Sequence, residues 1–537
     1  MTRQKTLALA LLIVAISLFI SPWLRDLFVG DETKYSQIIR EMRSADSFFV
    51  PRLNGSPYTH KPPLHFWMIY LLAIPFGALS IWPYVIPSLV AFVAMLFLMR
   101  RLGEEFFPAS DAGMISAFIF ATSFLAWGLA QTARMDLSFI FCISLTALLL
   151  KRFIDGENPR DLYLSAVVTG IGIMIKGPMA FVIPLFLMVL QRFRRKSLPR
   201  ASYLGAFLIA AGIPLLWLIP AVIIGGGEFA REILITQNVG RAVGSWVHRS
   251  PPWFYVIRAP LTFFPWFLLA VIALLTLYRT RERAGAVLSP ISGNAMFLVH
   301  WVIAVLVPFS LISGKLDIYM LPAFPPLALL MGDFVARRSG DSWARAAFRA
   351  NLITTLLVGV IGLVGLIGGS ALVRRADEKA LMTSPSVRTL LMITVAASVI
   401  GFVCQLLLRS DRLFHSTILT GLTAVAPLIA LSIVLLPTAN QNLSTAPLVA
   451  TLERQPGAGR DIALYACPFL WSRDLTPRLN DARYIGAEAL GSGSALPIVI
   501  ASRSTRTHEL GKALPENYRK VDEVKIKGMQ FDVYRRK

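Results

Sequence analysis

Long apolar runs that alternate with short basic loops are the feature that most limits how this chain can fold. The 537-residue sequence is 55% hydrophobic and only 16% charged. Runs of about 15 to 20 apolar residues recur over most of its length. Because a backbone in lipid must satisfy its own hydrogen bonds, such runs form spanning helices. The sequence therefore predicts a polytopic α-helical membrane protein.

About thirteen segments have the length and apolarity of a transmembrane helix. They are residues 7–21, 84–99, 108–130, 137–150, 162–175, 177–191, 202–222, 259–278, 295–312, 318–335, 351–373, 388–408 and 415–436. The first resembles a signal peptide but has no small-residue cleavage site before Pro22, so we expect an uncleaved span.

One further apolar stretch, Leu64–Leu79, decides the sidedness of every later loop. If it does not cross, basic clusters such as Arg100/Arg101 and Arg409/Arg412 share the cytoplasmic side with the N-terminus. If it crosses, every basic cluster after the first faces outward. We therefore expect an interfacial or re-entrant helix there. The outer-face loops are then residues 22–83, 131–136, 223–258 and 313–317.

The last part of the chain changes character. Ile462–Cys467 and Leu496–Ser502 have the composition of buried strands, and Tyr518–Arg536 alternates like a β-hairpin. We expect a transmembrane domain over residues 1–440 and a small periplasmic α/β domain over 441–537, in which we recognise no catalytic motif.

The formal net charge of +22 suits contact with anionic membrane lipid or with a phosphorylated lipid. Nucleic acid is excluded as a partner because the basic residues are scattered through short loops between spans. The three cysteines, Cys142, Cys404 and Cys467, predict neither a disulfide framework nor a zinc–thiolate site.

Charged residues of the outer loops are the candidates for chemistry. Asp31 and Glu32 follow Gly30 at the exit of a span, where they can cap and begin a helix, or bind a cation and accept a proton. Lys61 is held by Pro62-Pro63 near the membrane surface, as a lipid anchor or a phosphate ligand. His60 beside it is a candidate metal ligand.

Further candidates lie at the outer ends of later spans. Asp136 has Arg134 two residues away, so it either forms an ion pair with it or lines a site. Lys176 lies between two spans, where burying its charge in the membrane costs free energy unless an opposite charge pairs with it. Lys315 and Tyr319 lie close enough in sequence to form a phosphate clamp. The long outer loop adds possible partners: Arg241, Arg249 and Arg258, with Trp246, Trp253 and Tyr255 as interfacial anchors or a platform for a sugar or prenyl chain.

Four motifs in this order carry a family resemblance: "DETKYSQIIREM…THKPPLHFW", "ARMD", "GIMIKGP" and "SGKLDIYMLPAFPPLALL". They resemble the GT-C membrane glycosyltransferases of the protein-mannosyltransferase-like superfamily, and most of all the bacterial transferases that add 4-amino-4-deoxy-L-arabinose to lipid A. The resemblance covers about the first 340 residues well. It is specific for the superfamily and less so for the sugar.

The resemblance implies a multi-pass enzyme of the bacterial inner membrane. Such an enzyme moves a sugar from a polyprenyl-phosphate donor, usually undecaprenyl phosphate, to lipid A or another glycolipid at the periplasmic face, with inversion. No nucleotide cofactor is expected. Asp31 and Asp136 are then the catalytic carboxylates, with Asp31 as a general base for a hydroxyl acceptor or as an orienting group for a phosphate acceptor. Lys61, Arg241, Lys315, Tyr319 and Lys176 hold the donor phosphate, and Glu32 and Arg258 orient the acceptor.

Two positions depart from the aminoarabinose transferases. His60 stands where they have a glutamate, and Gln237-Asn238 where they have an acid–histidine pair. That family associates these positions with a bound metal, so the expectation of a divalent metal rests here on His60. Two other functions stay open: a protein acceptor, as in O-mannosyltransferases, and a transporter of lipid-linked sugars. The clustering of charges outside argues against the transporter.

The sidedness can be tested by cysteine labelling in a cysteine-free background. We expect an impermeant maleimide, applied to cells with a permeable outer membrane, to label Ser44→Cys and Ser494→Cys but not Asn158→Cys. Labelling at Asn158 would mean that Leu64–Leu79 crosses the membrane, and Asp136 would then face the cytoplasm.

Overall fold

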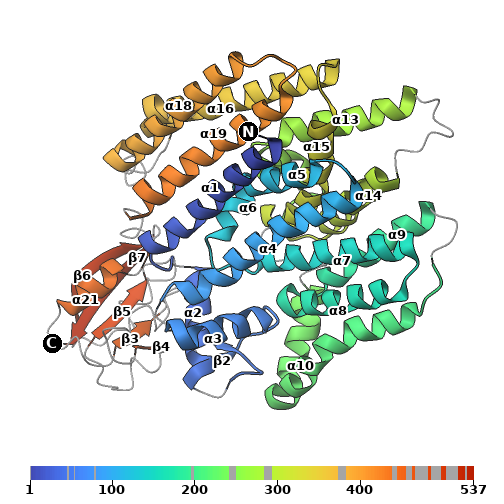
Figure 1. Ribbon diagram of the computed structural model, residues 1–537. Helices are drawn as coiled ribbons and strands as arrows, with labels where there is room; N and C mark the ends of the chain where they lie inside the picture. Colours follow the sequence, from blue (N-terminus) through green and yellow to red (C-terminus); the bar gives the residue numbers. More distant parts are fainter. Residues whose placement is uncertain are drawn as a thin grey trace. The chain divides into compact units, whose positions relative to one another are not determined.

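The structure is a computed structural model and is mostly helical (Figure 1). It describes residues 2–28, 30–44, 47–53, 55–77, 80–194, 199–240, 249–283, 293–372, 382–437, 444, 446–454, 462–465, 482–484, 498–502, 518–526 and 529–536. Ser494 and the strand residues expected at 466–467 and 496–497 lie outside these ranges.

Most helices are long and apolar. They are α1 (Arg3–Leu24), α4 (Trp82–Phe106), α5 (Ala112–Ala121), α6 (Phe124–Ala130), α7 (Asp136–Gly156), α8 (Pro159–Lys176), α9 (Met179–Arg194), α10 (Tyr203–Arg231), α12 (Phe254–Thr262), α13 (Phe267–Arg283), α14 (Gly293–Leu311), α15 (Phe324–Arg337), α16 (Ser342–Leu372), α18 (Pro385–Leu406) and α19 (Leu413–Ala430). The π-helical segments η1 (Glu232–Gly240) and η3 (Leu431–Leu435) extend α10 and α19, and the 3₁₀ segment η2 (Asp317–Ala323) leads into α15.

Among the described residues, nine helices are long and apolar enough to cross a membrane. The count rises to eleven if the bent pairs α5/α6 and α12/α13, with bends of 69° and 116°, are one span each. Every expected span overlaps a helix or, at 108–130 and 259–278, a bent pair of helices. The difference from the expected thirteen comes from α8, which carries three charged residues, and from α9, which has 16 residues. The polytopic helical membrane fold is confirmed, and the number of spans stays a prediction.

The stretch predicted to lie in the interface forms α3 (Leu64–Phe76). Its 13 residues rise by about 20 Å, less than the roughly 30 Å hydrocarbon core of a bilayer. This length agrees with a helix that does not cross.

Two compact units make up the chain. One, called here the membrane unit, comprises Met1–Ile20, Thr59–His65 and Pro87–Val434. The other, the mixed unit, comprises Ser21–Tyr58, Phe66–Ile86 and Leu435–Lys537. The tail predicted as a separate domain is therefore grouped with two segments from the beginning of the chain.

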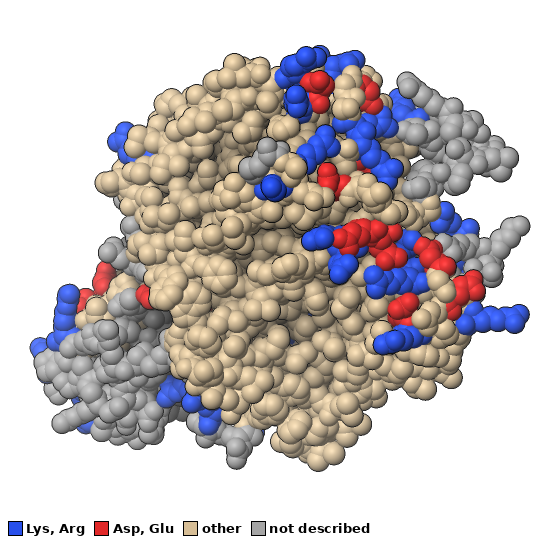
Figure 2. Space-filling view, in the orientation of Figure 1, with Lys and Arg blue, Asp and Glu red and all other residues tan. Residues whose placement is uncertain are grey.

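Helix pairs in the membrane unit pack through small residues, as is usual between membrane helices. α5 lies against α15, and a Cβ atom added to Gly332 would come within 2.1 Å of Ser116 Oγ. Large apolar side chains such as Leu216 and Ile367 are exposed on the outside. Figure 2 shows charged side chains gathered mainly along one edge of this face, beside a wide uncharged surface that suits contact with lipid.

A buried polar network joins α16, α18 and α19. Gln405 is fully buried; its amide donates to Thr355 Oγ1 at 2.8 Å and lies 3.3 Å from Thr420 Oγ1, and its carbonyl accepts from Ser416 at 3.1 Å. Asn351 donates to Ser416 and Thr417. Interhelical hydrogen bonds of this kind stabilise helix association in lipid.

The mixed unit contains the strands. α2 (Asp31–Ser44) precedes a short hairpin of β1 (Arg52–Leu53) and β2 (Ser56–Pro57). Near the C-terminus, β3 (Ile462–Tyr465), β4 (Ala482–Tyr484), β5 (Ile498–Ser502), β6 (Tyr518–Ile526) and β7 (Met529–Arg536) form one sheet in the order β4-β3-β5-β7-β6. α21 (Ala446–Glu453) packs on β6.

The predicted C-terminal hairpin is present, because β6 and β7 pair in antiparallel register. Phe531 and Val533 on β7 are fully buried and lie two residues apart, so they share one face of the sheet. Leu448 and Leu452 on α21 are also fully buried and share one helix face by their spacing. The described strands and helix therefore have the α/β character expected of the tail.

The polar network gives a test of the fold. We expect Gln405→Leu to lower the thermal unfolding temperature in detergent, because it leaves three hydroxyl partners without their amide at a cost of about 0.6 to 2 kcal/mol. Leu407→Ala, at a neighbouring side chain that is 81% exposed, is the matched control and should leave the temperature unchanged. Equal unfolding temperatures for wild type and Gln405→Leu would contradict a stabilising role for the network.

Candidate active site

A buried ion pair joins the start of α7 to the end of α8 in the membrane unit. Lys176 Nζ donates to Asp136 Oδ1, and the Asp136 side chain is 3% exposed and that of Lys176 11% exposed. The two residues are 40 positions apart, but α7 and α8 form a hairpin that brings these ends together. Sequence analysis selected both residues without pairing them.

The local sequence explains why both charges lie at helix ends. Asp136 is the first residue of α7, where a negative charge complements the helix dipole, and Lys176 is the last residue of α8, where a positive charge does the same. α8 ends because Gly177 has a φ of 97°, which favours glycine, and Pro178 follows it. The motif "KGP" thus ends one helix with its lysine facing the start of another.

Two aromatic rings flank the ammonium group of Lys176. Its Nζ lies 5.2 Å from the centroid of Phe139 and 5.4 Å from that of Tyr319, both within cation–π range. Tyr319, in η2, stacks on Phe309 of α14 with centroids 5.0 Å apart. Tyr319 was predicted to bind phosphate with Lys315, and the structure instead places its ring beside Lys176.

Three cationic side chains act on the carboxylate of Asp136. Besides Lys176, the charges of Arg134 and Lys61 act electrostatically on its carboxylate. Both of these side chains are half-buried. One carboxylate is thus surrounded by three cationic side chains, and the cluster can attract an anion without losing its own ion pair.

Arg134 belongs to a turn that a buried serine of α4 fixes in place. Ser88 Oγ lies 2.7 Å from the carbonyl oxygens of Thr132 and Arg134, and accepts from the Arg134 backbone N–H at 3.3 Å. This turn leads directly into α7, so Ser88 helps to position Arg134, two residues before the catalytic candidate Asp136.

His65 is fully buried near the same carboxylate. Burial lowers the pKa of its imidazole to about 4, against the opposing attraction of Asp136. The ring is therefore neutral at physiological pH and adds no charge to the cluster.

Lys315 is occupied by the backbone. Its ammonium donates to the carbonyl of Ser250 at 3.0 Å and to that of Ile312, and the residue is 3% exposed. A bridge between Arg249 and Gly314 joins the same two segments. Burial lowers the pKa of this lysine. The geometry favours a lysine that closes a loop over one that binds a substrate phosphate.

Arg258 forms a two-point ion pair with Asp317. Its Nε and Nη2 donate to the two carboxylate oxygens at 2.7 and 2.6 Å. This pair connects α12 to η2, the segment that carries Tyr319. Tyr255 on α12 is buried, whereas Trp253 just before it is 61% exposed.

The adjacent acids Asp31 and Glu32 of the mixed unit have different surroundings. Glu32 is buried, accepts from both terminal nitrogens of Arg25 at 2.6 and 2.8 Å, and accepts from the Phe28 N–H at 3.0 Å. Asp31 begins α2 after Gly30, whose φ is 138°, and pairs with Lys34 at 2.5 Å. The Asp31 side chain is 33% exposed, so it can meet a solute that Glu32 cannot.

The structure does not test the roles predicted for three residues, Arg241, Trp246 and His60. Arg241 and Trp246 lie outside the described residues. His60 is exposed, and no group of three or more His, Cys, Asp or Glu side chains in the described part of the chain could hold a metal ion. The expected divalent metal stays a prediction, and no step proposed below uses one.

Sequence analysis missed the residues that shape the cluster. Phe139 lies three positions after Asp136 on α7, so a search for side chains on the same helix face would have found it. Ser88 and Phe309 are distant in sequence and left no local signal.

Known proteins resemble this chain in both sequence and fold. Residues 60–218 match the family described as "Dolichyl-phosphate-mannose-protein mannosyltransferase". An undecaprenyl phosphate-α-4-amino-4-deoxy-L-arabinose arabinosyl transferase of Edwardsiella ictaluri is 30% identical over 362 residues, which are 64% of this chain and 61% of that protein. The Pseudomonas aeruginosa (strain LESB58) transferase of the same name is 28% identical over 68% of this chain and 66% of its own length. This chain thus matches less than two thirds of each relative's length.

Solved structures show the fold. The crystal structure of ArnT from Cupriavidus metallidurans bound to undecaprenyl phosphate aligns with a TM-score of 0.75, covering 99% of this chain and 98% of that chain at 16% identity. The archaeal oligosaccharyltransferase AglB from Archaeoglobus fulgidus aligns with a TM-score of 0.51, covering 95% of this chain and 70% of that one at 13% identity.

The ion pair gives a test by a double-mutant cycle. We expect Asp136→Asn to lower the free energy of unfolding by roughly 3 to 5 kcal/mol, because Lys176 then keeps a buried charge without its counter-ion. Adding Lys176→Gln should recover part of that loss. Unfolding in detergent measures both. Additive losses in the double variant would show that the two side chains do not interact.

Proposed function

We propose that this chain, which belongs to the GT-C membrane proteins and is similar to the aminoarabinose transferases, is a glycosyltransferase of the bacterial inner membrane. It moves a sugar from an undecaprenyl-phosphate donor to lipid A, or to another envelope glycolipid, at the periplasmic face. The names of the relatives and the full-length fold match to ArnT support this proposal.

The observation that carries the proposal is that three cationic side chains act at one place, around Asp136. When the bond from sugar to lipid phosphate breaks, the departing lipid phosphate gains negative charge. Lys61, Arg134 and Lys176 provide fixed positive charge there. In a partly dry site such preorganised charge stabilises the leaving group more than water would.

Lys176 is held in place before any substrate binds. Asp136 fixes its position, and Phe139 and Tyr319 cover its flanks. A lysine held this way loses little conformational freedom when it meets a phosphate, so its charge is available at small entropic cost. Asp136 therefore acts in this proposal as a positioning residue for the lysine.

Lys315 and Arg258 have a supporting task in the proposal. Both are engaged by protein oxygens, Lys315 by backbone carbonyls and Arg258 by Asp317. They brace the loop and the η2 segment that present Tyr319. This differs from the phosphate-binding and acceptor-orienting roles that the resemblance implied for them.

The acceptor decides what the acid Asp31 has to do. A hydroxyl acceptor needs a general base, and the partly exposed carboxylate of Asp31 can take that proton. A phosphate of lipid A is already anionic and needs no base, and Asp31 would then bind the amino group of the sugar. The pH dependence of the rate distinguishes the two, because a general base loses activity as it becomes protonated.

One observation favours a second acceptor class. The matched family over residues 60–218 is described as a mannosyltransferase that acts on protein. A protein hydroxyl acceptor would use the same donor-phosphate chemistry and differ only in what approaches the sugar.

Radiolabelled transfer with the purified protein tests the function. We expect label from undecaprenyl-phosphate aminoarabinose to appear in lipid A, and not in a Ser/Thr-rich protein acceptor. Transfer to protein alone would favour the second class. Movement of the donor across proteoliposome membranes without a new glycosidic bond would overturn both and favour a transporter.

Lys61 is expected to act on the donor. Lys61→Ala should raise the KM for the lipid-phosphate donor and leave the KM for the acceptor unchanged, because the lysine adds charge near the phosphate. Steady-state kinetics with each substrate varied in turn measure this. Lys520→Ala, on β6 of the C-terminal sheet, is a lysine control outside the proposed machinery and should change neither KM. An effect of Lys61→Ala confined to the acceptor KM would contradict the phosphate role.

Substitutions of Asp31 and Glu32 should affect different properties, the first activity and the second stability. Asp31→Asn removes an exposed ion pair worth at most about 1 kcal/mol, so we expect normal unfolding and nearly complete loss of activity. Glu32→Gln weakens a buried pair with Arg25 and should lower the unfolding temperature. Differential scanning fluorimetry beside the transfer assay measures both. A large drop in the unfolding temperature of Asp31→Asn would make Asp31 a structural residue.

A further inference from the structure

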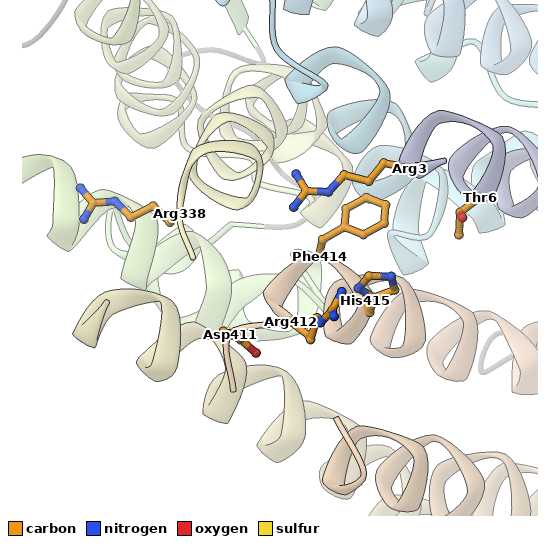
Figure 3. Close-up of a pocket in the computed structure, with 7 residues that line it drawn as sticks. All are labelled: Arg3, Thr6, Arg338, Asp411, Arg412, Phe414 and His415. Carbon is orange, nitrogen blue, oxygen red and sulfur yellow. The ribbon is translucent and has the colours of Figure 1, made fainter. Parts of the chain in front are cut away.

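A second cluster of cations surrounds a cavity of about 260 Å³ in the membrane unit (Figure 3). It is lined by Arg3, Thr6, Arg338, Asp411, Arg412, Phe414 and His415. These residues come from the start of α1, the end of α15 and the start of α19. By the expected sidedness, these are the cytoplasmic ends of three spans, and none of them belongs to the cluster around Asp136.

The charges of this cavity are not balanced by protein carboxylates. Arg338 pairs with Asp341 at 2.5 Å, and Asp411 lies 3.7 Å from Arg409. Within the described ranges, Arg3 and Arg412 form no ion pair. Two guanidinium groups therefore line the cavity without a carboxylate partner among the described residues.

The apolar part of the cavity orients one of these groups. The guanidinium carbon of Arg3 lies 5.1 Å from the ring centroid of Phe414, which is 3% exposed. Figure 3 shows Arg3 above this ring, with Arg412 and His415 below it. An arginine held over an aromatic ring keeps its edge free for hydrogen bonds to an oxyanion.

α19 begins at this cavity without a side-chain cap. Its N-cap residue, Arg412, makes no side-chain hydrogen bond to the helix, whereas Ser384 caps α18 with its hydroxyl. The first amides of the 18-residue helix α19 thus add to the positive potential that the two arginines create. The potential of these amides adds to that of the two arginines, and the proposal below does not depend on it.

An exposed apolar stripe leads away from the cavity along α1. Thr6 lines the cavity, and Leu9, Ile13 and Ile16 follow it at spacings of three and four residues, on one face of the helix. Their exposed fractions are 50%, 44% and 56%. A polar cavity that continues into a stripe of exposed apolar side chains matches a molecule with an anionic head and an acyl chain.

We propose that this cavity binds the phosphate of an anionic phospholipid, with Arg3 and Arg412 on the phosphate oxygens and one acyl chain along the α1 stripe. Guanidinium groups suit phosphate because they donate two parallel hydrogen bonds to it. A soluble phosphate would offer the same oxygens, but it would leave the apolar stripe uncovered. The site is separate from the proposed donor site and does not depend on the proposed reaction.

Native mass spectrometry of the full-length protein in detergent tests the proposal. Phosphatidylglycerol and phosphatidylethanolamine with the same acyl chains are added in turn, and the retained lipid is counted. We expect retention of phosphatidylglycerol over phosphatidylethanolamine. Arg3→Gln and Arg412→Gln should each weaken phosphatidylglycerol retention about fivefold, the effect of one cation at an anionic lipid surface.

Arg345→Gln on α16 is the control, because Arg345 is exposed, lies on the same expected side of the membrane and does not line the cavity. It should leave retention unchanged. An equal loss in Arg345→Gln, or no loss in the two cavity variants, would overturn the proposal. A third arm adds inorganic phosphate: stabilisation by phosphate that the cavity variants lose, without any preference among lipids, would overturn the lipid assignment.

Arg3 also helps to orient the first span, so its removal could prevent insertion. Thr6→Glu avoids this difficulty, since it keeps every arginine and places a carboxylate in the cavity. We expect it to abolish the preference for phosphatidylglycerol while the protein elutes as wild type. A folded Thr6→Glu variant with undiminished preference would contradict the proposal.

Discussion

The ion pair between Asp136 and Lys176 is the interaction on which the candidate active site depends. An ammonium group at the end of a membrane helix is costly unless an opposite charge meets it. Asp136 supplies that charge from the preceding helix, so the pair fixes the α7–α8 hairpin at its open end. The same pair holds Lys176 between rings of α7 and η2, so three elements share one cation. A change at either charge therefore affects both packing and the local potential.

The apolar pattern was enough to predict the helices, because length and hydropathy alone decide whether a segment can cross lipid. The breaks within spans could not be predicted the same way. α5 ends at Ala121, where the Thr122 and Ser123 hydroxyls donate to the carbonyls of Phe118 and Ile119. Such side chains compete with the helix backbone, and nothing in an apolar run shows whether they will.

The sequence identified residues of the candidate site but not which of them pair. A charged residue within or next to an apolar segment is easily recognised, so Asp136, Lys176 and Lys61 could be selected from the sequence. Which charges meet depends on helix packing over 40 positions, and sequence analysis offered Arg134 as the neighbour of Asp136 instead of Lys176. The surroundings of Lys315 could not be predicted from the sequence either. A lysine that closes a loop onto carbonyls and one that waits for phosphate look the same in sequence.

Net charge connects the two cation clusters. The chain has 53 lysine and arginine residues but 31 aspartate and glutamate residues, a difference of 22, so many cations cannot each have a carboxylate of their own. Some, such as Arg25 and Arg258, are committed to the fold by two-point ion pairs. The remainder must be neutralised by something other than protein. Around Asp136 and around the α19 cavity, cations lie beside aromatic side chains, and there a phosphate group gains most from binding because fewer water molecules compete for it.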